Sequence, residues 1–228
     1  MRTILVTGIG RGLGLELARQ FLRRGEQVIG TVRDAKAADA AERALGAGRQ
    51  LQILQLDVRD EHAIQAAAAQ VDRSVDVLIN NAGVIGPQRQ STLDMDFEGF
   101  LETLDVNVLG PLRITQAFLP HLRRSTNPKV VTISSRMGSL SYAKSDRIAY
   151  RASKAAVNKV VQGLATDLAA EGIVVVSVHP EWVRTDMGGA DADISSDTSA
   201  AGMITLIDRL QASDTGRFFD YRGEPLAF

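Results

Sequence analysis

Short runs of apolar and β-branched residues alternate along the chain with longer stretches in which apolar residues recur every three or four positions. The short runs predict buried strands and the longer stretches predict amphipathic helices. Strands are expected at 3–6, 28–32, 51–56, 75–79, 129–133 and 173–178, with 217–219 as a candidate seventh. Helices are expected near 13–24, 35–46, 60–73, 97–124, 150–170 and 199–211.

This alternation of strands and helices predicts one parallel sheet covered by helices on both faces. We therefore expect an α/β protein with a single doubly wound Rossmann domain over 1–228 and a sheet of about seven strands. The stretch 187–199 is rich in Gly, Ser and Asp and has little apolar content. It predicts a mobile surface loop and a candidate lid, which places a small substrate-loop region near 186–200.

Composition narrows the classes of function. The net charge is −1, from 26 basic and 27 acidic residues, so no basic field favours nucleic acid as a partner. Cysteine is absent, which excludes disulfides and thiolate nucleophiles. No apolar run approaches a membrane span or a signal segment, and we expect a cytoplasmic protein with no membrane partner. His62, His121 and His179 are not spaced like metal ligands, so no metal is expected.

A glycine-rich turn follows the first predicted strand. It reads Thr7-Gly8-Ile9-Gly10-Arg11-Gly12-Leu13-Gly14 and runs directly into a predicted helix. Glycines let the chain turn tightly and let backbone N–H groups approach a pyrophosphate, which the helix N-terminus also attracts. An ordinary strand–helix turn is the alternative. A P-loop is disfavoured because no Gly-Lys-Ser/Thr follows.

Four further segments follow in a fixed order. They are Asn80-Asn81-Ala82-Gly83, Asp-Val-Asn-Val-Leu-Gly-Pro around Asn107, Ser134-Ser135, and Tyr150-Arg151-Ala152-Ser153-Lys154. With the spacing Thr-Gly-x-x-x-Gly-x-Gly, they resemble the short-chain dehydrogenase/reductase family over about residues 3–186. The residues around Asn107 and the segment Ser-Ser-Arg-Met-Gly most resemble C-factor-like and sniffer-like carbonyl reductases.

The resemblance implies an NADP(H)-dependent oxidoreductase that interconverts a small-molecule carbonyl and an alcohol by hydride transfer, with a tyrosine as acid/base. The candidate catalytic residues are Asn107, Ser135, Tyr150 and Lys154. The candidate cofactor-binding residues are Thr7, Gly8, Arg11, Gly12, Leu13, Gly14, Arg33, Asp57, Val58, Asn81, Ala82, Gly83, Tyr150, Lys154, Pro180, Val183 and Thr185.

The end of the second predicted strand favours NADP(H) over NAD(H). An NAD site usually has a carboxylate there for the ribose 2′-hydroxyl, but Val32 occupies this place. Arg11 and Arg33 suit a 2′-phosphate, which accepts bidentate hydrogen bonds. The alternative for Arg33 is a surface ion pair with Asp34. The resemblance gives Asp57 a contact with adenine, and its alternative role is a helix cap.

Tyr150 and Lys154 are four residues apart, so a helix places them on one face. A phenol has a pKa near ~10, and a nearby ammonium lowers it by favouring the phenolate. Lys154 is also suited to holding ribose hydroxyls, and the resemblance has Ser135 bind the substrate oxygen. The family's usual spacing between this serine and the tyrosine is shorter than in this chain, so 138–149 must loop out. This leaves Ser139 as an alternative to Ser135.

Asn107 precedes a proline that leaves one helical hydrogen bond unmade. Pro111 lacks the amide that would bond the carbonyl of residue 107 in a continuous helix. The free carbonyl would start a water relay to Lys154, the role that the resemblance assigns to Asn107. The alternative is an ordinary proline kink.

Glu181 departs from the resemblance. The segment His179-Pro180-Glu181-Trp182-Val183-Arg184-Thr185 resembles Pro-Gly-x-x-x-Thr, with Glu181 in place of the glycine. The backbone at Glu181 is either ordinary or strained. The carboxylate either faces solvent, where it would pair with Arg184 or another base, or faces the nicotinamide. We expect the solvent-facing arrangement because exposed charge is usual.

Two other functions remain as alternatives. One is a non-catalytic NADP-binding sensor or signalling protein on the same fold, and the other is a Rossmann-like methyltransferase, which Val32-Arg33 disfavours. Small residues at Ala149, Ala152, Ala155 and Ala156, together with the family's habit, predict a homodimer or homotetramer. The sequence does not identify the substrate. Candidate pocket residues are Arg136, Met137, Leu140, Tyr142 and Trp182.

Overall fold

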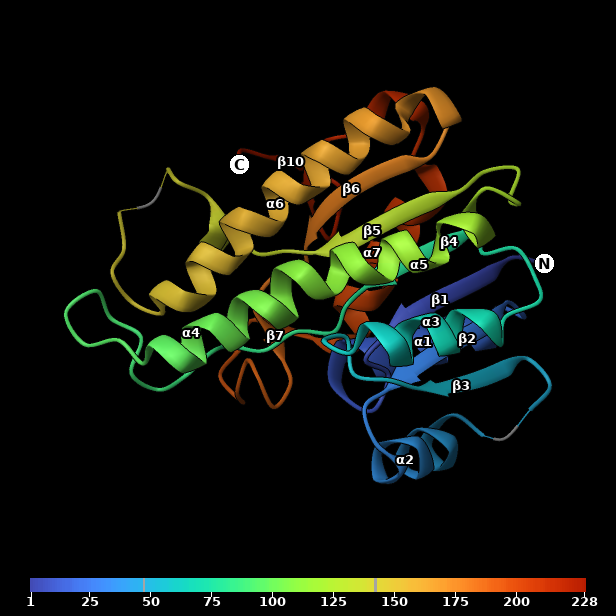
Figure 1. The fold of residues 1–228 in the computed structure, drawn as a ribbon, viewed down its shortest axis with the longest axis horizontal. Coiled ribbons are helices and arrows are strands. Elements are labelled where there is room, and N and C mark those ends of the chain that lie inside the picture. The colour runs from blue at the N-terminus through green and yellow to red at the C-terminus, as the bar shows by residue number, and fades with distance from the viewer. Residues whose placement is uncertain (47, 142) are drawn as a thin grey trace.

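The computed structural model describes residues 1–46, 48–141 and 143–228, so Tyr142 lies outside the described residues. Its main sheet has eight strands in the order β10-β9-β6-β5-β4-β1-β2-β3, of which all but β10 run parallel (Figure 1). The strands are β1 Thr3–Thr7, β2 Gln27–Val32, β3 Leu51–Gln55, β4 Val77–Asn80, β5 Lys129–Ile133, β6 Val174–His179, β9 Phe218–Asp220 and β10 Pro225–Leu226. The expected parallel, doubly wound sheet is confirmed, with one short antiparallel strand added at its edge.

Helices cover both faces of this sheet (Figure 1). One face carries α1 Gly12–Arg23, α2 Ala35–Leu45 and α7 Ser196–Arg209. The other carries α3 Glu61–Ala69, α5 Gly110–Leu122 and α6 Ile148–Leu168. The central strands are buried on both faces, which explains why their sequences are apolar almost throughout.

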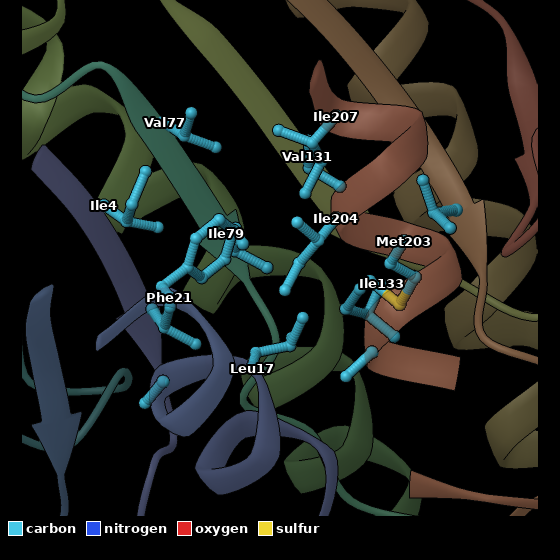
Figure 2. Packing of buried hydrophobic residues seen from close by; sticks show 14 of the residues in the cluster. Ile4, Leu17, Phe21, Val77, Ile79, Val131, Ile133, Met203, Ile204 and Ile207 are labelled. Atoms are coloured by element: carbon cyan, nitrogen blue, oxygen red, sulfur yellow. The ribbon is translucent and has the colours of Figure 1, made fainter. Parts of the chain in front are cut away.

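The face between the sheet, α1 and α7 shows how the core is filled. Leu17 and Phe21 of α1 and Met203, Ile204 and Ile207 of α7 pack against side chains of the central strands (Figure 2). All five of these helix residues are at most 3% exposed. Burying one such side chain contributes about 1.5–3 kcal/mol, so this face stabilises the sheet beneath the candidate site.

The predicted helix at 97–124 is wrong in one respect. The structure has α4 Phe97–Leu104, then a π-helical turn, η1 Asp105–Leu109, and then α5. The amide of Gly110 donates to the carbonyl of Asp105, five residues back. Pro111 then falls in the first turn of α5, and its missing amide leaves a carbonyl of the preceding turn without an intrahelical bond. Asn107 lies at the centre of η1.

The predicted lid at 187–199 is also wrong in extent. Strand β8, Ile194–Ser195, pairs with β7, Val183–Arg184, and α7 begins at Ser196. Trp182 Nε1 donates to the carbonyl of Gly188 at 2.8 Å, and Arg184 Nη1 donates to that of Ala192 at 2.8 Å. These bonds tie the remaining irregular stretch to the segment before it.

The strand order reverses between β1 and β4, and ligands of doubly wound sheets bind in the crevice at such a point. The glycine-rich turn leaves β1 here, and the Asn81 segment leaves β4. Within the described ranges, no helix is long and apolar enough to cross a membrane. The same ranges contain no group of three or more His, Cys, Asp or Glu placed to hold a metal ion.

Candidate active site

Hydrogen bonds join the glycine-rich turn to the segment that follows β4. Thr7 Oγ1 accepts from the amides of Asn81 at 2.9 Å and Ala82 at 3.0 Å. Asn81 Nδ2 donates to the carbonyls of Thr7 at 2.9 Å and Gly8 at 3.2 Å. The side chains of Thr7 and Asn81 therefore hold the two walls of the crevice together.

The turn itself has the shape of a phosphate cradle. Gly8 and Gly12 have φ of 76° and 60°, which other residues rarely adopt. A Cβ on Gly14 would lie 2.3 Å from the carbonyl oxygen of Gly8, so only glycine fits there. Helix α1 begins at Gly12 with no side-chain cap and no acidic residue in its first turn, which leaves its positive N-terminus for an anion. Leu13 packs against the core, so its backbone is the part suited to a ligand.

Two arginines lie exposed beside this cradle. The side chain of Arg11 is 78% exposed, and its Nη1 lies 2.7 Å from Asp186. Arg33 is 73% exposed and its Nε lies 3.9 Å from Asp34 Oδ2, the surface pair considered as its alternative role. Asp34 also accepts a hydrogen bond from the amide of Ala37 and so caps α2. Exposed pairs of this kind contribute roughly 0–1 kcal/mol, so both guanidinium groups are available to a stronger anion.

Asp57 and Val58 follow β3 at the adenine side. Asp57 accepts hydrogen bonds from the amide and the side chain of Arg59, and the Arg59 side-chain bonds are the largest of the effects that hold the pKa of Asp57 below its ordinary value. The alternative role of Asp57 as a helix cap is wrong, because Asp60 caps α3 by accepting from the amide of Ala63 at 3.0 Å. Val58 is buried where Gly110 of α5 approaches it closely.

Ser135, Tyr150 and Lys154 come together at the carboxyl end of β5. Ser135 lies close enough to the phenol of Tyr150 to oppose the rise in its pKa. Lys154 Nζ lies 5.6 Å from the centre of the Tyr150 ring and donates to the carbonyl of Ile133 at 2.8 Å. Ser139 donates instead to the carbonyl of Phe228. Of the two candidate serines, the structure therefore places Ser135 beside the tyrosine.

Burial is the main influence on the protonation of Tyr150 and Lys154 in the ligand-free protein. It raises the pKa of Tyr150 above its ordinary value, against the opposing effects of the Ser135 hydrogen bond and the charge of Arg147. The phenol is therefore neutral and can donate a proton. Burial lowers the pKa of Lys154 from 10.5 to about 8, so its ammonium titrates just above neutral pH.

This pKa predicts how stability depends on pH. Between about pH 8 and 10.5 the unfolded chain holds a proton on Lys154 that the folded chain has lost, so this residue makes stability rise with pH. Below pH 8 both states are protonated and the burial penalty is constant. We expect the unfolding free energy of the ligand-free parent, minus that of Lys154→Met, to rise across this window. Urea titrations at pH 7, 8, 9 and 10 measure it, and a constant difference contradicts the lowered pKa.

Asn107 is fully buried in the π-helical turn η1. Its Oδ1 accepts from the amide of Val84 at 2.9 Å, and its Nδ2 donates to the carbonyl of Val84 at 2.9 Å and to Ser153 Oγ at 3.0 Å. Ser153 Oγ in turn donates to the carbonyl of Tyr150 at 2.7 Å. Gly83 lies so close that a Cβ on it would be 3.1 Å from Asn107 Oδ1. The side chain of Asn107 thus links the segment after β4 to the helix that carries Tyr150.

The segment after β6 returns to the glycine-rich turn. The carbonyl of Pro180 accepts from Ser199 Oγ at 2.6 Å, and Val183 is buried in β7. Thr185 lies against Gly12, where an added Cβ would meet its Cγ2 at 3.5 Å. Pro180, Val183 and Thr185 therefore bring this segment across the crevice to the cradle.

The structure decides between the two alternatives for the backbone of Glu181. Its backbone has a φ of 73°, the left-handed conformation in which glycine is usual, so the strained alternative holds. Its carboxylate does not pair with Arg184. Its oxygens lie 3.4 Å from His179 Nε2 and 3.8 Å from Arg136 Nη2, and the side chain is 23% exposed.

Two residues near the site had no signal in the sequence. Gln90 is buried, and its Oε1 accepts from the amide of Tyr150 at 3.1 Å, which satisfies an open donor in the first turn of α6. Arg147 precedes this helix with a φ of 52°. Gln90 bonds Tyr150 from 60 residues away along the chain, and Arg147 acts on the phenol through its charge. Neither periodicity nor a motif in the sequence marks these two residues.

Comparisons with known proteins agree with this geometry. Residues 2–194 match the family described as short chain dehydrogenase. The C-signal of Myxococcus xanthus is 50% identical over 151 residues, which are 65% of this chain and 90% of that protein. The structure of carbonyl reductase Sniffer of D. melanogaster superposes with a TM-score of 0.94 at 31% identity, covering both chains fully. That of NADPH-bound carbonyl reductase from chicken fatty liver superposes with a TM-score of 0.93 at 31% identity over 100% of this chain and 99% of that one.

Proposed function

The chain belongs to the short-chain dehydrogenase family, and we propose that it is an NADP(H)-dependent oxidoreductase that interconverts a carbonyl compound and an alcohol. The observation that carries this proposal is the meeting of Ser135, Tyr150 and Lys154 beside a glycine cradle. A pyrophosphate suits this turn because Gly8 and Gly12 have positive φ, Gly14 packs directly against the backbone of Gly8, and the N-terminus of α1 is uncapped. The NADPH-bound chicken enzyme, which has the same fold, supports the choice of cofactor.

We assign the chemical roles from these contacts. Bound NADPH supplies a hydride to the carbonyl carbon. The hydroxyl of Ser135 donates a hydrogen bond to the carbonyl oxygen, and Tyr150 gives that oxygen the proton that completes the alcohol. The ammonium of Lys154 stabilises the phenolate that remains, since opposite charges at short range favour the charged form. Asn107 holds the chain that presents Tyr150, and the carbonyl of Asn107 is the proposed start of a water relay to Lys154.

Residues around the cradle would hold the cofactor. Arg11 and Arg33 would bind the 2′-phosphate, and Asp57 and Val58 the adenine. Amides of the glycine-rich turn would bind the pyrophosphate, while Lys154 would bind ribose hydroxyls. The remaining contacts, toward the nicotinamide half, are assigned to Asn81, Ala82, Gly83, Pro180, Val183 and Thr185.

Arg33→Ala tests the choice of cofactor. Losing one charge-assisted contact to a phosphate costs about 1.5–3 kcal/mol, so the Kd for NADPH should rise about tenfold or more while that for NADH changes less than twofold. Titration of the bound-nucleotide fluorescence measures both constants. Equal affinity of the parent protein for the two cofactors contradicts the assignment.

We also propose that the protein is a homodimer or homotetramer formed through the helices α4 to α6. Phe97 and Leu101 of α4 are 74% and 67% exposed, and they lie one turn apart on the helix next to α6. Exposed apolar side chains grouped in this way are costly in water and favour association. Light scattering at micromolar concentration is expected to give twice or four times 24.5 kDa, and a mass of 24.5 kDa contradicts assembly.

The identity to C-signal favours a second candidate, a cofactor-binding signalling protein without turnover. Incubation with NADPH and a panel of aldehydes, ketones and diketones, followed by absorbance at the nicotinamide band, separates the two functions. Turnover of at least one carbonyl is expected. Tight NADPH binding without turnover of any panel member favours the signalling function instead.

A further inference from the structure

Two arginines lie on the segments that carry the Ser135–Tyr150 pair. Arg136 directly follows Ser135 and begins the short helical turn η2 Arg136–Gly138, which packs against α6. Arg147 precedes α6, three residues before Tyr150. Neither takes part in the proton transfer proposed above. Both differ from the neighbouring Arg151, which is bound to Asp146 at 2.8 Å and to the carbonyl of Met137.

The guanidinium of Arg136 has open hydrogen-bonding capacity. Its Nη2 lies 3.8 Å from Glu181 Oε2, beyond hydrogen-bond distance. Its Nε is buried and has no acceptor among the described residues. The side chain as a whole is 41% exposed, so its terminal nitrogens remain accessible. An arginine offers five N–H donors, and a buried donor without an acceptor is costly, which suits a site completed by an anionic ligand.

Arg147 is an exposed residue three positions before Tyr150. Its φ of 52° is uncommon for a residue other than glycine. Its side chain is exposed and makes no hydrogen bond or ion pair within 1–46, 48–141 and 143–228. Arg147 stands at the N-cap of α6, the helix that presents the Tyr150 phenol, and its charge opposes the rise in the pKa of that phenol. A left-handed conformation at such a place suggests function, since strain persists where the surroundings enforce it.

Glu181 is the acidic partner of Arg136. One carboxylate oxygen of Glu181 lies near Arg136 and the other lies near the buried ring of His179. The Nδ1 atom of that ring has no partner among the described residues. At these distances Glu181 attracts the guanidinium without occupying its hydrogen bonds. Its negative charge therefore reduces the local positive charge beside Arg136.

We propose that the preferred substrate is a carbonyl compound that carries a carboxylate, which binds to Arg136 and Arg147 while its carbonyl oxygen binds to Ser135 and Tyr150. This inference rests on the proposed oxidoreductase function and names its substrate class. Leu140 and Trp182, which are 87% and 48% exposed, offer apolar surface for the body of such a substrate. Planar guanidinium groups match a carboxylate bidentately, which gives the site specificity as well as affinity.

The test compares 3- and 4-carboxybenzaldehyde with their methyl esters, which keep the carbonyl and the ring but lack the charge. We expect the parent enzyme to favour one acid over its ester at least tenfold in kcat/KM. Arg136→Gln and Arg147→Gln should each lower this ratio about tenfold through the KM of the acid. Glu181→Gln should raise the ratio, because it removes the charge that opposes the acid. Arg23→Gln, an exposed change of equal charge on α1, is the control and should leave the ratio unchanged.

Three results overturn the substrate class. They are equal kcat/KM for acids and esters in the parent, arginine variants that slow acid and ester alike, and reduction of other carbonyls in the panel but of neither acid. A Glu181→Gln enzyme with a lower ratio overturns the role given to Glu181. Failure to reduce any carbonyl contradicts the proposed oxidoreductase function itself, so the two failures are distinguishable.

Discussion

Replacing Tyr150 by phenylalanine is expected to lower kcat for carbonyl reduction by about 10²–10⁴-fold, the usual contribution of a positioned general acid. The variant removes one hydroxyl and keeps the ring that lies 5.6 Å from Lys154 Nζ. It also keeps the amide that binds Gln90, so α6 should begin unchanged. The Kd for NADPH should therefore rise no more than about tenfold, since losing one neutral hydrogen bond costs about 0.5–1.5 kcal/mol.

Steady-state kinetics and fluorescence titration of NADPH measure the two effects separately. Tyr221→Phe is the matched control, because Tyr221 packs beside α7 at Gly202, away from the Ser135 segment. It should keep turnover near the parent's. A Tyr150→Phe enzyme with turnover near the parent's contradicts the role of the phenol as proton donor.

The second large effect is expected from Gly14→Val in the first turn of α1. Its Cβ would lie 2.3 Å from the carbonyl oxygen of Gly8 and 2.4 Å from Asn81 Nδ2. This clash can be relieved only if the backbone of the glycine-rich turn moves, because the carbonyl oxygen of Gly8 is a main-chain atom. Overpacking of this kind costs about 1–3 kcal/mol in stability, and we expect the Kd for NADPH to rise at least a hundredfold as the cradle loses its shape.

Gly163→Ala separates the clash from the simple loss of a glycine. Gly163 lies inside α6 with nothing within 4 Å of an added Cβ, so alanine there should stabilise the fold by about 0.5–1 kcal/mol and leave the cofactor affinity unchanged. Thermal unfolding with and without NADPH measures both variants. If Gly14→Val binds NADPH like the parent, the turn after β1 is not the phosphate site.

The sheet could be predicted from the sequence because its strands are short, β-branched and buried on both faces, which leaves a strong local pattern. The same holds for the glycine-rich turn and for the pairing of Tyr150 with Lys154, which need only the geometry of one turn or one helix.

Long-range and conformational features could not be predicted in this way. Asn107 lies in a π-helical turn just before Pro111, and apolar periodicity does not report the extra residue that such a turn contains. Gln90 binds the start of α6 from a distant loop. The partners of Glu181 could not be named from the sequence, because the ends of β5 and β6 bring Arg136 and His179 to its carboxylate. Such contacts depend on which strands become neighbours.

Glu181 also shows how a departure from a family pattern is informative. The left-handed backbone persists although the glycine that suits it is absent. A non-glycine residue in this region costs of order 1–3 kcal/mol, so the fold enforces a conformation that the side chain disfavours. The segment after β6 therefore imposes this backbone conformation on the residue at position 181. In this chain that residue places a carboxylate beside Arg136.

The most direct test of the central claim follows the hydride itself. Parent enzyme is incubated with NADPH carrying deuterium at both C4 positions and with an aldehyde that it turns over, and the alcohol is analysed by mass spectrometry. The proposed function predicts one deuterium at the carbinol carbon for each NADPH oxidised, with the reaction almost abolished in Tyr150→Phe. No alcohol, or an alcohol without deuterium at that carbon, would contradict hydride transfer by this protein.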